Sequence, residues 1–335
     1  MTRNTIVVTL LFACVLALPG SPQTAQAGET QLIRIATLAP KDSELSRGFN
    51  KINQNLRTAT HDGWGIRLYP SGIAGDEKDV IRKMRVGQMD SSIITTTGLS
   101  QIVREVAVLD APGVIAGYPE LERVQKVMNK EWEETFRKNG FELLGWGETG
   151  QYRYFSKQPI TKVSDFKSMR PWVWPQSYVL QEIYRAIGAT GVPLQVPEVY
   201  GALQTGMIDS LIATALAVVA LQWHTKLSYV TQRTHGVLLG AMIMTSEKWN
   251  AIPEDVRATL LTEIHKNTEG DRQNVSKQDD RAFKKLLEHG YKATTYSAAG
   301  EKEYQAMAET VRKRLAGRVY PQALLERVMK IAAGK

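Results

Sequence analysis

The residue types that most enzymes use for catalysis are few and scattered in this chain. Its five histidines lie at positions 61, 224, 235, 265 and 289, without a spacing that would bring two of them to one metal ion. The sequence also lacks the nucleophile elbow of hydrolases, the glycine-rich loop that binds nucleotide phosphates and the His-Glu-x-x-His pattern of zinc proteases. We therefore expect no enzyme, no metal site and no cofactor.

One cation stands in a context that suits binding. Arg170 lies between Met169 and Pro171-Trp-Val-Trp174, so its guanidinium is expected in apolar surroundings. An arginine is always charged and can hold a carboxylate through two parallel hydrogen bonds. The residues alone leave two interpretations open, a bound organic acid or an ion pair with an aspartate or glutamate of the chain itself. The second is the more frequent arrangement, because charges inside proteins are normally paired internally.

Length and composition indicate a folded protein of two domains. The chain has 335 residues, 43% of them apolar, and a formal net charge of +8. At the N-terminus, Arg3 is followed by an apolar run from Ile6 to Leu18 and by a segment that ends in Ala25-Gln-Ala27, the pattern of a secretory signal. We expect residues 1–27 to be removed, the only cysteine, Cys14, to leave with them unlipidated, and the mature protein to be periplasmic.

The mature chain is not expected to span a membrane or to bind nucleic acid. No later segment has about 20 uninterrupted apolar residues, the length that a membrane-spanning helix needs. Basic residues are in excess over residues 281–335, which could contact nucleic acid, but export makes that partner improbable. A solvated helical face is the preferred interpretation of this segment.

The order of strand and helix patterns predicts an α/β fold. Strands are expected at 31–37, 65–69 and 89–95, and the stretches 43–58 and 76–86 between them have helical spacing. Strand-helix-strand order favours parallel strands in one sheet. The alternation returns in the second half of the chain. There we expect strands at 167–174, 191–196 and 238–244, and helices at 177–187, 198–204, 213–226, 253–287, 299–316 and 321–333.

A short internal repeat indicates two lobes that are built alike. Residues 84–93 and 203–212 both show a helix that ends at glycine, an aspartate three positions later, and the start of an apolar strand. We predict a first lobe of residues 28–150 plus 239–278. The second lobe is predicted to comprise residues 151–238 plus 279–335, including the C-terminal helices, and the long helix at 253–287 is expected to span both.

The second copy of the repeat lies within a larger block that resembles a known family. Arg170-Pro-Trp-Val-Trp-Pro175, followed by Val196-Pro-Glu-Val-Tyr-Gly-Ala-Leu-Gln-Thr-Gly-Met-Ile-Asp209, is similar to the DctP-type solute receptors of TRAP (tripartite ATP-independent periplasmic) transporters. Residues 68–77 resemble the first-lobe pattern of the same family. The resemblance implies a two-lobed periplasmic binding protein fold with hinge strands. It also implies a receptor that closes on a small organic anion and delivers it to TRAP membrane subunits.

The resemblance also implies which residues contact the ligand. Arg170 matches the family arginine that pairs with the ligand carboxylate, and Tyr152-Arg153 falls where a second arginine often lies. The other implied cleft residues come from the strand ends and the cleft mouth. They are Thr37, Leu38, Ala39, Glu77, Thr95, Thr96, Ala213 and Thr214.

The chain departs from the family pattern in a way that predicts an unusual ligand. Thr95 or Thr96 and Ala213-Thr214 stand where sugar-acid receptors carry more polar residues, and Trp172 and Trp174 follow the arginine. We expect one tryptophan, preferentially Trp172, to face the cleft and the other to point away. An acid with one carboxylate and an apolar or aromatic body suits such a lining.

Two other functions remain open from the sequence. The same fold could serve as a ligand-sensing co-receptor for a membrane sensor kinase. An exported hydrolase or lyase is the weaker alternative, because no catalytic constellation is visible in the sequence.

Overall fold

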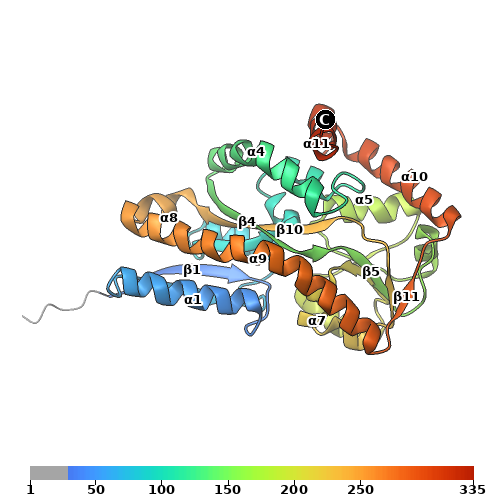
Figure 1. Ribbon diagram of the computed structural model, residues 1–335, viewed down its shortest axis with the longest axis horizontal. Helices are drawn as coiled ribbons and strands as arrows, with labels where there is room; N and C mark the ends of the chain where they lie inside the picture. The colour runs from blue at the N-terminus through green and yellow to red at the C-terminus, as the bar shows by residue number, and fades with distance from the viewer. Residues whose placement is uncertain (1–28) are drawn as a thin grey trace, which may run out of the picture.

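The computed structural model describes residues 29–335, apart from the side chains of 268–273 (Figure 1). The predicted secretory signal and Cys14 lie outside the described residues. Within residues 29–335, no helix is both long and apolar enough to cross a membrane. The fold is α/β, as predicted, and consists of two lobes, each built around its own sheet.

The sheet of the first lobe has the strand order β2-β1-β3-β10-β4. Its strands are β1 (Gln31–Thr37), β2 (Trp64–Tyr69), β3 (Ser91–Thr95), β4 (Phe141–Gln151) and β10 (Val237–Thr245). β1 pairs in parallel with β2 and β3, as the strand-helix-strand pattern predicts, whereas β10 is antiparallel to β3 and β4.

Helices pack on both faces of this first sheet because its strands are buried on both sides. Ile33 and Ile35 point to one face, where they join apolar residues of α1 (Glu44–Ala59) and α9 (Glu254–Glu288) in one cluster. Ala36 points to the other face and packs with residues of α2 (Glu77–Arg85) and α4 (Tyr118–Lys138). Because side chains alternate along β1, the strand packs against a layer of helices on each face of the sheet.

The sheet of the second lobe has the strand order β11-β9-β5-β8. These strands are β5 (Arg153–Ser156), β8 (Ser210–Ala213), β9 (Tyr229–Thr231) and β11 (Lys292–Thr294). A separate pair, β6 (Trp172–Val173) and β7 (Val192–Pro193), joins β8 through a bridge between Pro171 and Ser210. The helices of this lobe are α5 (Tyr178–Ile187), α6 (Val199–Thr205), α7 (Ala215–Ala220) and α10 (Ala298–Leu315), of which α10 packs on α5.

Three segments cross between the lobes. β4 runs into β5 at Tyr152, β9 returns to β10, and α9 packs on α1 and β4 at one end and on α7 at the other (Figure 1). The long helix predicted at 253–287 is thus confirmed. Its buried Asp279 accepts hydrogen bonds from the backbone N–H groups of Gln151 (3.0 Å) and Leu216 (2.9 Å), which joins both lobes to one carboxylate.

The approach of α9 to this crossing requires a glycine. Gly150 has φ of +123°, and a Cβ atom there would lie 2.4 Å from the carboxyl carbon of Asp279. Only a residue without a side chain satisfies both the positive φ and the close contact.

Two sequence-based expectations about the helices are wrong. Residues 213–226 do not form one helix, because the backbone turns at Gln222 (φ +59°), between α7 and a short 3-10 helix, η4 (Trp223–Lys226). Helix α11 (Gln322–Ala332), expected with the second lobe, packs on α4 of the first. An ion pair of Arg327 with Glu131 at 2.7 Å joins α11 to α4.

The internal repeat has a physical basis, because each aspartate binds both the backbone and the guanidinium of an arginine. Asp90 accepts hydrogen bonds from the backbone N–H of Arg34 at 2.7 Å and from its guanidinium at 2.7 and 3.0 Å. Asp209 accepts from the backbone N–H of Arg170 at 2.8 Å and from its Nε at 3.3 Å. In both pairs the aspartate N–H donates to the arginine carbonyl oxygen at 3.1 Å. We call each pair an Arg–Asp clamp.

The two clamps differ in burial, and this difference predicts unequal effects on stability. We expect Asp90→Ala to lower the free energy of unfolding by about 2–3 kcal/mol, because it leaves a partly buried N–H and guanidinium without their acceptor. Asp209→Ala should cost about 1 kcal/mol, since the Arg170 side chain is 62% exposed and water replaces the lost bonds. Urea unfolding followed by tryptophan fluorescence measures both. Glu309→Ala, which removes an exposed ion pair with Lys313 within α10, is the control. An equal cost at Asp90 and Asp209 would contradict the predicted effect of burial.

Candidate ligand cavity

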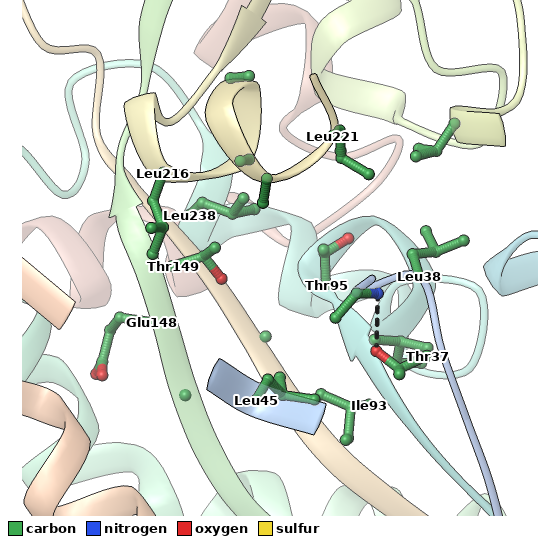
Figure 2. Close-up of a pocket in the computed structure, with 18 of the residues that line it drawn as sticks. Thr37, Leu38, Leu45, Ile93, Thr95, Glu148, Thr149, Leu216, Leu221 and Leu238 are labelled. Atoms are coloured by element: carbon green, nitrogen blue, oxygen red, sulfur yellow. Dashed lines mark hydrogen bonds between the residues drawn. The ribbon is translucent and has the colours of Figure 1, made fainter. Parts of the chain in front are cut away.

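A cavity of about 900 Å³ lies between the two lobes, where strands of both sheets end. Thr37 ends β1 and Leu38 follows it, Thr95 ends β3, and Leu238 lies on β10 (Figure 2). The second lobe contributes Leu216 on α7 among other residues. Ligands of α/β proteins bind at such strand ends, because the loops there converge from several strands.

The cavity lining is mostly apolar. Figure 2 shows Leu216, Leu221 and Leu238 on one side of the space, and Leu45 and Ile93 on another. Burial of a matching apolar surface would contribute roughly 25 cal/mol for each Å² that leaves water. The lining therefore favours a solute with an apolar body.

Both tryptophans line the cavity. Trp172 Nε1 donates to the carbonyl oxygen of Leu194 at 2.8 Å, and Trp174 Nε1 donates to Asp76 Oδ2 at 3.0 Å. Their ring centroids are 5.8 Å apart. The expectation that only one of them faces the cleft is wrong, because residues two positions apart along an extended backbone share a face. With both indole N–H groups bonded to the protein, the rings offer apolar area to a ligand.

Glu77 lies buried in the cavity wall and organises the end of β3. Its carboxylate accepts hydrogen bonds from the backbone N–H of Thr95 at 2.7 Å and from Thr95 Oγ1 at 3.0 Å. Burial raises the pKa of Glu77 to about 8, against the lowering effect of these hydrogen bonds. Glu77 thus positions Thr95, with which it lines the cavity.

Arg170 does not face the cavity, which corrects the central expectation from the sequence. Its guanidinium is held by Asp209 in the Arg–Asp clamp of the second lobe, its side chain is 62% exposed, and it is not among the lining residues. The physical reason is the clamp itself, which occupies the backbone and side chain of Arg170 together. Of the two interpretations of Arg170 that the sequence allowed, the ion pair with an acid of the chain itself is therefore the observed one.

Arg153 and Tyr152 separate at the lobe crossing. Tyr152 lines the cavity, as expected. Arg153 does not, because its buried guanidinium donates to the carbonyl oxygens of Thr231 and Gln232 and lies 4.1 Å from the centre of the Phe283 ring. Adjacent residues on a strand point to opposite sides, which separates the two side chains.

The remaining expected residues divide into lining and supporting positions. Thr37, Leu38, Ala39, Thr95 and Ala213 line the cavity, and the N–H of Ala39 donates to Thr37 Oγ1 at 3.2 Å, the dashed line in Figure 2. Two threonines lie behind this surface. Thr96 donates a hydrogen bond to Asp110, and Thr214 accepts one from the N–H of Ala217 at the start of α7. Both therefore support the wall without lining it.

Several polar lining residues were not identified from the sequence. Asp110, Glu148, Thr149 and His235 all line the cavity. Asp110 ends the short helix η1 (Arg104–Asp110), just before Ala111-Pro112. Apolar residues on both sides of that aspartate were the one available signal of a buried acid.

Positive charge in the lining comes from the rim on the first lobe. Lys41 and Arg47 are lining residues with exposed side chains, and they lie in the loop after β1 and in α1. The exposed acids Asp42 and Glu44 line the same rim. His235 also lines the cavity, but burial and the nearby arginines hold its pKa well below the usual value, so it is neutral. Among the described residues, no group of three or more His, Cys, Asp or Glu side chains could hold a metal ion.

Comparison with known proteins agrees with this architecture. Residues 35–318 match the family model of the bacterial extracellular solute-binding proteins, family 7. The chain belongs to this family. It is 22% identical to the C4-dicarboxylate-binding periplasmic protein DctP of Rhodobacter capsulatus over 264 residues, which are 78% of this chain and 79% of that protein.

Solved structures show the same fold for the family-7 chain. A sugar acid binding protein from Advenella mimigardefordensis, in complex with galactonate, superposes with a TM-score of 0.84 at 16% identity and covers 91% of this chain and 99% of its own. A TRAP periplasmic solute-binding protein from Desulfovibrio salexigens with bound orotic acid has a TM-score of 0.80 at 18% identity and covers 91% of this chain and 98% of its own. The two-lobed fold expected from the resemblance is confirmed.

The buried position of Glu77 predicts a pH-dependent stability. Because its pKa is raised from 4.5 to about 8, the folded protein binds more protons than the unfolded chain between these values, so stability falls as pH rises through that window. We expect the loss of unfolding free energy across this pH window to be roughly 2–4 kcal/mol smaller in Glu77→Gln. Urea unfolding of both proteins at several pH values from 4 to 9 measures the difference. Parallel pH profiles for the two proteins would refute a buried, neutral Glu77 in the native state.

Proposed function

We propose that this family-7 protein is a periplasmic receptor that encloses a small organic acid with an apolar or aromatic body between its lobes. It then delivers this solute to TRAP membrane subunits. The observation that carries the proposal is the cavity at the strand ends, to which both lobes contribute and whose lining is mostly apolar. Structural relatives hold galactonate, succinate or orotic acid as bound solutes, all of which are organic acids.

Ligand capture follows from closure of the lobes on the solute. The apolar body contacts Trp172 and Trp174, and Lys41 and Arg47 at the rim supply positive charge for the carboxylate. As water leaves, each hydrogen bond to a charged group contributes about 1.5–3 kcal/mol. The solute favours the closed form by its extra contacts in that form, and the closed shape is what the membrane subunits recognise.

The lining distinguishes this receptor from one for polyhydroxylated acids. A sugar acid would leave its hydroxyl groups against Leu216, Leu221 and Leu238 without partners, and each unpaired polar group costs free energy.

A thermal-shift screen of organic acids on the mature, ligand-stripped protein tests the proposal. We expect aromatic and branched aliphatic acids to raise the melting temperature, and galactonate and galacturonate to have little effect. A large shift with the sugar acids and none with apolar acids would overturn the proposed ligand class. Steady turnover of a binding compound would instead indicate an enzyme.

A pair of arginine variants tests where the carboxylate binds. We expect Arg170→Ala to keep the wild-type affinity for an acid found in the screen, because this guanidinium lies outside the cavity. Arg47→Ala should weaken binding about 3- to 30-fold, the loss of one partly exposed charged contact. Titration calorimetry measures both, with circular dichroism as the check on folding. A large loss of affinity in Arg170→Ala, with normal stability, would return the ligand contact to Arg170.

A further inference from the structure

Asp110 is a half-buried acid in the cavity wall, and one of its carboxyl oxygens is a buried acceptor without a partner. Its Oδ2 accepts a hydrogen bond from Thr96 Oγ1, whereas its Oδ1 is buried and has no hydrogen-bond partner. The residue lines the cavity. No ion pair to Asp110 is formed among the described residues, and the basic lining residues Lys41 and Arg47 sit at the exposed rim.

Such an unpaired carboxyl oxygen lowers the stability of the empty receptor. A buried acceptor without a donor loses its hydration and gains nothing in return, and an uncompensated buried charge costs more. The pKa of Asp110 reflects the same cost. Burial raises this pKa to about 7, and the hydrogen bond from Thr96 is the only contact that lowers it. A donor, and above all a positively charged one, is what this position lacks.

The groups near Asp110 do not supply that charge. Glu77 on α2 is a second acid in the same wall, and the pKa of the Tyr152 hydroxyl is raised by burial and by the nearby Asp110 and Glu77. Arg312 on α10 donates a hydrogen bond to the carbonyl oxygen of Pro112, two residues after Asp110. Neither Glu77 nor Tyr152 is a cation, so a positively charged partner for Asp110 would have to come from the solute.

We propose that Asp110 accepts a hydrogen bond from a protonated nitrogen of the solute, so that the cargo is an organic acid that also carries an ammonium or amidinium group. This inference rests on the proposed function, which places an organic acid in the cavity. It adds that the solute carries a second polar group, a protonated nitrogen. The solute then spans the site, with its cation at Asp110, its apolar body at Trp172 and Trp174, and its carboxylate toward the Lys41 and Arg47 rim.

Matched compounds that differ only in charge test the proposal. L-phenylalanine, phenylpropionate and phenylethylamine share an aromatic body and carry both groups, the carboxylate alone, or the ammonium alone. Leucine, isocaproate and isoamylamine form a second series with an aliphatic body. Titration calorimetry on the wild-type mature protein should show that the amino acid of the better-fitting series binds about 10- to 100-fold more tightly than its carboxylate analogue.

The variant Asp110→Asn identifies the residue responsible. It keeps the size of the side chain and an acceptor for Thr96 but removes the negative charge, and we expect it to abolish the advantage of the amino acid over the plain acid. Asp255→Asn, an exposed aspartate at the start of α9 that does not line the cavity, is the matched control and should retain that advantage. The wild-type comparison stands on its own even if Asp110→Asn fails to fold.

The possible outcomes separate the inference from the proposed function. If plain acids bind as tightly as their amino counterparts, or if no ammonium-bearing compound binds, the role of Asp110 is overturned while a receptor for plain acids stands. If amines bind and acids do not, the role of Asp110 is supported and the proposed organic-acid class fails. An unchanged preference in Asp110→Asn also overturns the assignment.

Discussion

In each lobe, one aspartate holds both the backbone and the side chain of an arginine that lies in a strand or just before one. Asp90 does so for Arg34 within β1, and Asp209 does so for Arg170 just before β6. A carboxylate that accepts from a backbone N–H and a guanidinium together restrains the strand more than a side-chain pair alone, because the backbone cannot move without breaking both bonds. The residues that follow these arginines reach the cavity.

This constraint has a consequence for recognition. Because the guanidinium of Arg170 is used in the clamp, the cavity that both lobes line has apolar side chains where a charged contact was expected. Trp172 and Trp174 come two and four residues after the clamp and present their rings instead. Polar contacts are left to the threonines at the ends of β1 and β3, to buried acids, and to the cations at the rim.

Much of the framework could be predicted from residue patterns, since it depends on local periodicity. The long α9 and the parallel strands at the N-terminus follow from helical spacing and from the strand-helix-strand order. The lining by Thr37, Leu38 and Thr95 was implied by the family resemblance. The direction of Arg170 could not be predicted, because its partner is 39 residues away and a family arginine in the same block indicated a ligand instead. The break at Gln222 was also hidden, since an apolar run gives no sign of a positive φ.

Asp110 shows a further limit of the sequence. Its importance depends on burial by segments that are distant in the chain, and no local pattern reports that an oxygen lacks a donor. The two-lobed plan and the family could be recognised from short motifs, whereas the chemistry of the wall required the packed side chains.

The central claim is that the solute is held by the apolar cavity while Arg170 stays on Asp209. The most direct measurement is a crystal structure of the mature protein with an acid from the screen bound. We predict density against Trp172 and Trp174, next to Thr95, with the Arg170 guanidinium still in its clamp. A structure in which that guanidinium has left Asp209 and contacts the solute carboxylate would contradict the account.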